Sequence, residues 1–241
     1  MKKKRLKKVA AVVIVIFAVL AAVSIGYASN YYHSDKSVET YMSGTADVSV
    51  TEIKEGLFLD GSGTQQAIIF YPGAKVEYTA YLPLFMELAE QGTDCFLVKM
   101  PCNLAIFGVN KADRIMGKYD YENWYLAGHS LGGAMAASYA SSNPGTLSGL
   151  ILLASYPTKS LPSEDFRVLS LYGSEDKVLN MKKVDEGRQF MPEDYTEICI
   201  EGGNHAQFGS YGEQEGDGKA TISGEEQRKQ TAEAVLKIME K

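Results

Sequence analysis

Cysteine and histidine are scarce in this chain of 241 residues, which holds only three of each. Three cysteines are too few, and odd in number, for the disulfide framework typical of small secreted domains. Cys95 and Cys199 fall within short apolar runs, so we expect both to be buried as small hydrophobic residues. No spacing of Cys and His resembles a metal site, and the sequence predicts neither a metal nor another cofactor.

Acidic residues are absent from the first eight positions, which hold six Lys and Arg residues. The whole chain has 24 basic residues, so 18 of them stand against all 30 acidic residues in the remainder. That remainder therefore carries a net charge of about −12. A body this acidic is repelled by phosphate backbones, which argues against nucleic acid as a partner.

Charged residues are also absent from residues 9–28. About twenty apolar residues, at ~1.5 Å each along a helix, match the ~30 Å hydrocarbon core of a bilayer. The basic residues 1–8 would stay cytoplasmic, so we expect a single-pass signal anchor with the rest of the chain outside. The alternative is a cleaved secretory signal, whose apolar core is usually ~7–15 residues long and ends at a small-x-small site. In that case the protein is secreted.

The remaining sequence predicts a short stalk followed by one α/β domain. Residues 29–49 are polar and lack hydrophobic periodicity, so we expect them to link membrane and domain. From residue 50 to 241, short apolar runs alternate with amphipathic stretches, which is typical of a mostly parallel central sheet with helices on both faces. The expected strands are 48–53, 56–60, 66–71, 95–99, 124–127, 150–154, 168–172 and 197–200, and the expected helices are 78–91, 111–118, 132–142 and a C-terminal helix from Ser223.

The motif with the clearest chemistry is Gly128-His129-Ser130-Leu131-Gly132. Gly-x-Ser-x-Gly forms a nucleophile elbow when a strand precedes it and a helix follows, because the serine then takes a strained conformation above the sheet. Both conditions hold here, since an apolar run leads into Gly128 and an alanine-rich stretch follows Gly132. We therefore predict the α/β-hydrolase fold, with Ser130 as the nucleophile.

A serine nucleophile needs a base, and only three histidines can supply it. His33 lies in the expected stalk, and His129 is held in the elbow and points away from the serine. His205 follows the last expected strand, where this fold presents its base. His205 is therefore the candidate base.

The acid that orients the base should lie between Ser130 and His205 in the chain order of this fold. Asp176 follows the strand 168–172 at its carboxyl end, where open α/β sheets place their ligands. Glu175 is the adjacent competitor, and we favour Asp176. Its role would be to hold the imidazole in the correct tautomer and to stabilise the imidazolium.

Two backbone amides should stabilise the oxyanion that develops during acyl transfer. We expect these to be the N–H groups of Leu131, directly after the nucleophile, and Ala74, in the turn after the early strand. Lys75 could reach an anionic substrate group, although we favour a solvated lysine. Phe208 and Tyr211 are the expected walls of the site.

The connection between the strand after the elbow helix and the strand before Asp176 is short. Only residues 155–166 fill this gap, which is too little for a cap domain. We therefore expect an open site, which argues against a buried channel for long acyl chains.

Together, these residues resemble a compact family of bacterial proteins catalogued as the fifth α/β-hydrolase domain family, from about Ala67 to the C-terminus. The matching segments are Tyr71-Pro72-Gly73, Val98-Lys99-Met100-Pro101, Asn103-Leu104-Ala105, Gly128-His129-Ser130-Leu131-Gly132-Gly133, Gly202-Gly203-Asn204-His205-Ala206-Gln207-Phe208-Gly209 and Gly216-Asp217-Gly218. The resemblance implies the α/β-hydrolase fold and a triad of Ser130, Asp176 and His205. It does not imply a substrate.

These observations predict a membrane-anchored serine hydrolase that cleaves a carboxylic ester or related acyl bond through an acyl-enzyme. The expected partners are the membrane, through the N-terminal helix, and a small-molecule or cell-envelope acyl substrate. An acyltransferase would use the same triad with a hydroxyl acceptor in place of water. A catalytically silent binding module of the same fold is a third alternative.

Overall fold

The computed structural model describes residues 8, 13–16, 19, 26 and 29–240. Contacts divide the chain into residues 1–31 and 32–241, and the folded domain lies in the second unit. Most of the expected anchor, residues 9–28, lies outside the described residues, so the anchor stays a prediction. Among the residues that are described, no helix has the length and apolar character needed to cross a bilayer.

One eight-stranded sheet organises the domain, with the strand order β1-β2-β4-β3-β5-β6-β7-β8. The strands are β1 (Ser49–Ile53), β2 (Gly56–Asp60), β3 (Gln66–Tyr71), β4 (Asp94–Val98), β5 (Asn123–His129), β6 (Gly149–Leu153), β7 (Arg167–Gly173) and β8 (Thr196–Ile200). β1 and β2 form an antiparallel hairpin, and β2 is antiparallel to β4. All pairings from β4 through β8 are parallel, so these strands end at one common edge. The mostly parallel sheet is confirmed.

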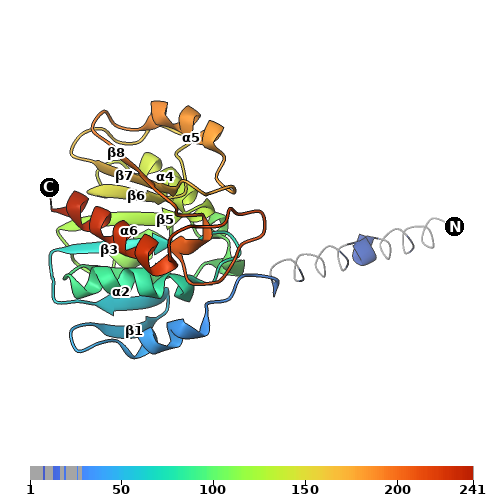
Figure 1. Ribbon diagram of the computed structural model, residues 1–241, viewed down its shortest axis with the longest axis horizontal. Coiled ribbons are helices and arrows are strands. Elements are labelled where there is room, and N and C mark those ends of the chain that lie inside the picture. Colours follow the sequence, from blue (N-terminus) through green and yellow to red (C-terminus); the bar gives the residue numbers. More distant parts are fainter. Residues whose placement is uncertain (1–7, 9–12, 17–18, 20–25, 27–28, 241) are drawn as a thin grey trace. The chain divides into compact units, whose positions relative to one another are not determined.

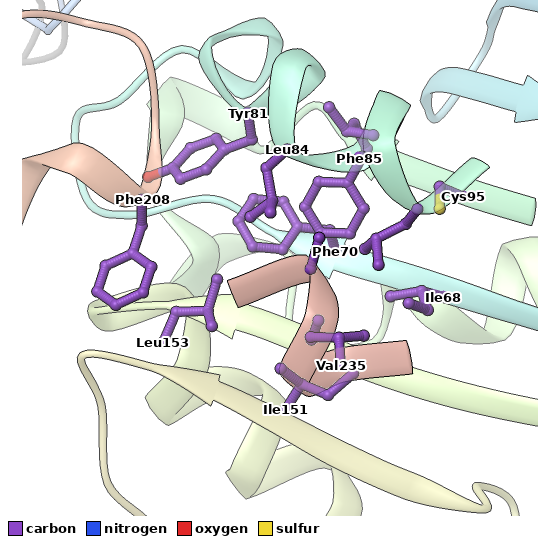
Figure 2. Close-up of a cluster of buried hydrophobic side chains, with 14 of the residues drawn as sticks. Ile68, Phe70, Tyr81, Leu84, Phe85, Cys95, Ile151, Leu153, Phe208 and Val235 are labelled. Atoms are coloured by element: carbon purple, nitrogen blue, oxygen red, sulfur yellow. The ribbon is translucent and has the colours of Figure 1, made fainter. Parts of the chain in front are cut away.

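Helices cover both faces of the sheet (Figure 1). The helices are α2 (Leu82–Glu90), α3 (Lys111–Met116), α4 (Leu131–Ser142), α5 (Met181–Gly187) and α6 (Gly224–Met239). α2 and α6 pack on one face, and α3 and α4 pack on the other. Successive side chains of a strand point to opposite faces, so Ile68 and Phe70 join the first cluster and Ile69 and Tyr71 the second. Figure 2 shows Ile68 and Phe70 beside Phe85 and Val235.

The expected helix 78–91 is divided into a 3-10 turn, η2 (Tyr78–Tyr81), and α2. Pro83 in the first turn of α2 explains where the α-helix starts, because proline lacks the amide that an earlier helical turn would need. The C-terminal helix α6 is capped at its N-terminus, since the Ser223 hydroxyl accepts a hydrogen bond of 3.1 Å from the Glu226 amide. The segment between β6 and β7 contains no helix or strand, and no cap domain is present there.

The prediction of a free stalk is corrected from Tyr32 onward, because these residues pack on the domain. The 3-10 helix η1 (Lys36–Ser43) buries Val38 in the core that also contains α2. Cys199 is also corrected, because it is exposed while Cys95 is buried as expected. β8 is the edge strand of the sheet, paired only with β7, and this position leaves Cys199 accessible to solvent.

Candidate active site

Ser130 lies on a sharp turn between β5 and α4. Its backbone has φ 52° and ψ −121°, which is a strained conformation for a residue with a side chain. Its amide donates to the Leu153 carbonyl over 2.9 Å, and its carbonyl accepts from the Ser155 hydroxyl over 2.8 Å. β6 and the residues that follow it therefore hold the strained turn on both sides.

Two elbow glycines are required by close approach of the backbone. A Cβ on Gly132 would lie 2.1 Å from the Tyr71 carbonyl oxygen, and one on Gly128 would lie 2.5 Å from the backbone of Gly133. Real Cβ atoms do not come this close to other atoms, so any larger residue would push the helix away from the strand. The spacing of the glycines in the motif thus follows from the packing of α4 against β3 and β5.

His205 and Asp176 form a buried pair at the carboxyl ends of β8 and β7. His205 Nδ1 lies 2.8 Å from Asp176 Oδ2, and the two side chains are 2% and 1% exposed. The other carboxylate oxygen of Asp176 accepts hydrogen bonds from the Val178 amide at 2.9 Å and the Leu179 amide at 2.8 Å. These two amides fix the orientation of the carboxylate. A carboxylate on Nδ1 is the arrangement that orients a histidine base.

Three polar residues that the sequence analysis did not assign hold the His205 loop. Gln227, fully buried on α6, accepts from the Asn204 amide at 2.9 Å and donates to the Asn204 carbonyl at 2.8 Å. Asp217 accepts from the Ala206 amide at 2.9 Å. The segments that resemble the family contain Asn204 and Asp217, but the resemblance assigns neither residue a role. For Gln227, the sequence shows only a polar residue within an apolar helix face.

The turn after β3 carries the second expected oxyanion donor. The Gly73 amide donates to the Tyr81 hydroxyl at 3.1 Å, and the Lys75 amide donates to the Asn103 carbonyl at 2.8 Å. Lys75 has φ 58°, in the left-handed region, so the turn is tightly wound. Ala74 lies between these two anchored residues and is partly exposed. Leu131, at the first position of α4, belongs to the first turn of the helix, where amides have no partner within the helix.

His129 is buried in the elbow and contacts Tyr81. Its Nδ1 lies 2.8 Å from the Tyr81 hydroxyl, and its ring centroid lies 4.5 Å from that of His205. Burial, together with the neighbouring His205, lowers the pKa of His129 well below its usual range. Burial likewise raises the pKa of Tyr81, which therefore keeps its proton. The Tyr81 hydroxyl accepts from the Gly73 amide and shares a hydrogen bond with a neutral His129.

The two residues expected to wall the site are packed into the protein interior. Phe208 is fully buried, with its ring 5.7 Å from that of His129. Figure 2 shows Phe208 within the core beside Leu153 and near Tyr81. Tyr211 is also buried, against the rings of Tyr32 and Tyr81. Both residues support the loop from within the fold.

The segment that enters the domain at Tyr32 is hydrogen-bonded to two loops of the candidate site. The Tyr32 amide donates to the Lys75 carbonyl at 2.7 Å, and its carbonyl accepts from the Glu77 amide at 2.9 Å. Farther on, the Asp35 amide donates to the Ser210 carbonyl at 2.8 Å. This segment therefore bridges the oxyanion turn and the loop after His205, a role that the sequence did not indicate.

Within the described part of the chain, no cluster of His, Cys, Asp and Glu has the arrangement needed to hold a metal ion.

Comparison with known proteins agrees with this architecture. The model of a family described as the alpha/beta hydrolase family matches residues 67–229, so the chain belongs to that family. This match confirms the family resemblance. No curated protein sequence gives a significant match.

Solved structures of hydrolases share the fold at low sequence identity. A membrane phospholipase A described as a bacterial virulence factor aligns with a TM-score of 0.61 at 14% identity, over 98% of this chain and 99% of its own. Carboxylesterase CesB from Bacillus subtilis has a TM-score of 0.56 at 10% identity, over 84% and 94%. The naproxen esterase from the same organism has a TM-score of 0.56 at 12% identity, over 84% and 94%. At these identities the likeness shows the fold.

Proposed function

We propose that the protein is a serine hydrolase that cleaves a carboxylic ester or related acyl bond. The observation that carries this proposal is the buried pair of His205 Nδ1 and Asp176 Oδ2, 2.8 Å apart, in the loops after β8 and β7 at the same edge of the sheet as the strained elbow of Ser130. A buried carboxylate that orients a histidine, at the same sheet edge as a strained serine, is suited to nucleophilic catalysis. Two of the structural neighbours are named as esterases, which agrees with this reaction class.

In the proposed mechanism, Ser130 Oγ attacks the acyl carbon while His205 takes its proton. The amides of Leu131 and Ala74 stabilise the oxyanion of the tetrahedral intermediate. The bond to the alcohol then breaks, and the alcohol leaves with the proton that His205 carried. Water repeats these steps on the acyl-enzyme and releases a carboxylic acid and free Ser130.

The test is turnover of p-nitrophenyl acetate by the full chain and by two serine variants. Ser130→Ala should abolish turnover. Ser148→Ala is the matched control, because its hydroxyl contacts Asn123 at the start of β5, away from the elbow, and it should retain activity. Equal turnover by the Ser130 variant and the wild type would contradict the proposal. A wild type without turnover would indicate the binding-module alternative.

Acyltransfer uses the same residues and is separated from hydrolysis by its product. With a sugar alcohol added as acceptor, a hydrolase releases mainly free acid, whereas an acyltransferase yields mainly the new ester. We expect free acid to predominate.

We also propose that residues 9–28 anchor the protein in the cell membrane, with residues 1–8 cytoplasmic and the domain outside. Six basic residues followed by an uncharged run support this orientation. Sequencing the N-terminus of the protein from cells tests it. An intact N-terminus in the membrane fraction is expected, while a mature chain that begins near Ser29 would indicate a secreted protein.

A further inference from the structure

Exposed apolar side chains of the domain gather on the loops around the candidate active site. Between residues 32 and 240, the exposed large hydrophobic residues are Met42, Ile106, Phe107, Val178 and Met181. The most exposed are Ile106 at 55% and Phe107 at 64%. Single exposed apolar side chains are common, but apolar side chains exposed close to one another often mark a contact with another surface.

The topology places four of these five residues at one edge of the sheet. Ile106 and Phe107 belong to the 3-10 turn η4 (Ala105–Phe107), which follows β4, while Val178 and Met181 follow β7. β4 and β7 run parallel to β5 and β8, which lead to Ser130 and His205. The exposed apolar residues and the catalytic candidates therefore share the carboxyl edge.

Met42 is the exception, and it lies at the other edge. β1 is antiparallel to β2, and β2 is antiparallel to β4, so β1 runs in the same direction as β4. Met42 precedes the start of β1, at the amino edge. Because Met42 is exposed but lies at the edge opposite the catalytic candidates, it serves as a control residue.

The chain also enters the domain at the carboxyl edge. Tyr32 is hydrogen-bonded to Lys75 and Glu77, in the turn that follows β3. Only four residue steps separate Tyr32 from Ala28, the end of the proposed anchor, and these span at most about 14 Å when fully extended. If the proposed anchor ends at Ala28, at most this length of chain separates it from Tyr32.

We propose that the carboxyl edge contacts the bilayer through Ile106 and Phe107, and that the substrate is an ester lipid of that bilayer. This inference rests on the proposed function. Exposed aliphatic and aromatic side chains insert favourably at the boundary of headgroups and acyl chains. Ser130 would bond to the acyl carbon of the lipid, and the lipid alcohol would leave with the proton from His205. Water would then release the fatty acid.

The experiment uses the full chain in phosphatidylcholine vesicles that contain a fluorogenic ester phospholipid. The same vesicles are assayed with p-nitrophenyl acetate, which reaches the site from water. The double substitution Ile106→Ser and Phe107→Ser should lower phospholipid hydrolysis about tenfold and leave p-nitrophenyl acetate turnover unchanged. Met42→Ser should change neither rate. If the double variant also loses turnover of the soluble ester, Phe107→Ser alone replaces it and carries the same prediction.

Two results would overturn the bilayer inference while leaving the proposed function intact. The first is phospholipid hydrolysis by the double variant at the wild-type rate. The second is a wild type that turns over p-nitrophenyl acetate but not the phospholipid. A wild type that hydrolyses neither ester would overturn both.

Discussion

The Tyr81 hydroxyl lies 2.8 Å from His129 Nδ1 and links the nucleophile elbow to the turn that carries Ala74. The same hydroxyl accepts the Gly73 amide at 3.1 Å, and all three groups are buried. A Cβ on Gly73 would lie 2.8 Å from His129 Nδ1, so the turn and the elbow also approach closely. Tyr81 therefore acts as a positioning residue between the two sources of proposed oxyanion donors.

Tyr81→Phe should lower both stability and kcat. The substitution leaves the Gly73 amide and His129 Nδ1 buried without a partner, at a cost of about 1–3 kcal/mol for each. A small displacement of the oxyanion turn should reduce kcat about tenfold or more, because misplacement of ~1 Å can cost ~10²-fold. Steady-state kinetics below the melting temperature measures the effect.

Tyr125→Phe is the matched control for this prediction. Its hydroxyl accepts from Arg167 at 2.9 Å, near the amino end of β5, and the residue is buried. It should lose stability but keep kcat. Equal kcat in the two variants would contradict a positioning role for Tyr81.

The burial of His129 should make stability depend on pH. The pKa of His129 is held well below its usual range in the folded protein, whereas the unfolded chain titrates near pH ~6.5. Below that pH the unfolded chain binds a proton that the folded protein does not, so folding stability falls as pH falls. His129→Asn keeps an acceptor for Tyr81 and lacks this titration.

Thermal unfolding of both proteins between about pH 8 and pH 5 measures this contribution. The melting temperature should fall more steeply with acidification for the wild type than for His129→Asn. Any excess of the wild-type melting temperature over that of the variant therefore shrinks. Parallel curves would show that His129 is not held neutral.

Asp176→Asn should lower kcat strongly. An amide in place of the carboxylate disfavours the productive histidine tautomer, and the equivalent change in a serine protease costs about 10⁴-fold in kcat. Glu175→Gln is the matched control, because Glu175 neighbours Asp176 while its backbone amide contacts the Gly203 carbonyl. Turnover of p-nitrophenyl acetate by the two variants distinguishes them. A larger loss in the Glu175 variant would reassign the acid.

Gly132→Ala should prevent correct folding of the elbow, because the added Cβ would meet the carbonyl oxygens of Tyr71 at 2.1 Å and Pro72 at 2.4 Å. We expect a loss of more than about 4 kcal/mol in the free energy of unfolding. Gly117→Ala, at φ −73°, is the control and should change it by no more than about 1 kcal/mol. Chemical denaturation of both variants gives the comparison, and similar values would contradict the packing account.

Features that depend on local sequence were predictable. The elbow is set by five consecutive residues, and the scarcity of histidine left one candidate for the base. Strand positions followed from short apolar runs. The β1–β2 hairpin and the Ser223 cap of α6 each involve only a few consecutive residues. Asp176 was favoured over Glu175 by its place after β7, and the structure brings Asp176 to His205.

Features that depend on distant contacts were not predictable from one sequence. Residues 32–49 have too few apolar residues to indicate packing, yet Tyr32 pairs with a turn more than forty residues away. Phe208 and Tyr211 lie in a glycine-rich loop, which suggested exposure. Tyr211 packs against Tyr81 of η2 and Tyr32 of the N-terminal segment, and Phe208 packs against His129 of the elbow. Gln227 contacts Asn204 only because α6 packs behind the His205 loop.

The central claim is that Ser130 is the nucleophile, and labelling with a fluorophosphonate tests it most directly. The reagent reacts with a serine that is activated by its base, and peptide mapping by mass spectrometry identifies the modified residue. We predict a single adduct on Ser130 that is absent from Ser130→Ala and strongly reduced in His205→Ala. An adduct on another serine, or labelling that persists in Ser130→Ala, would contradict the account.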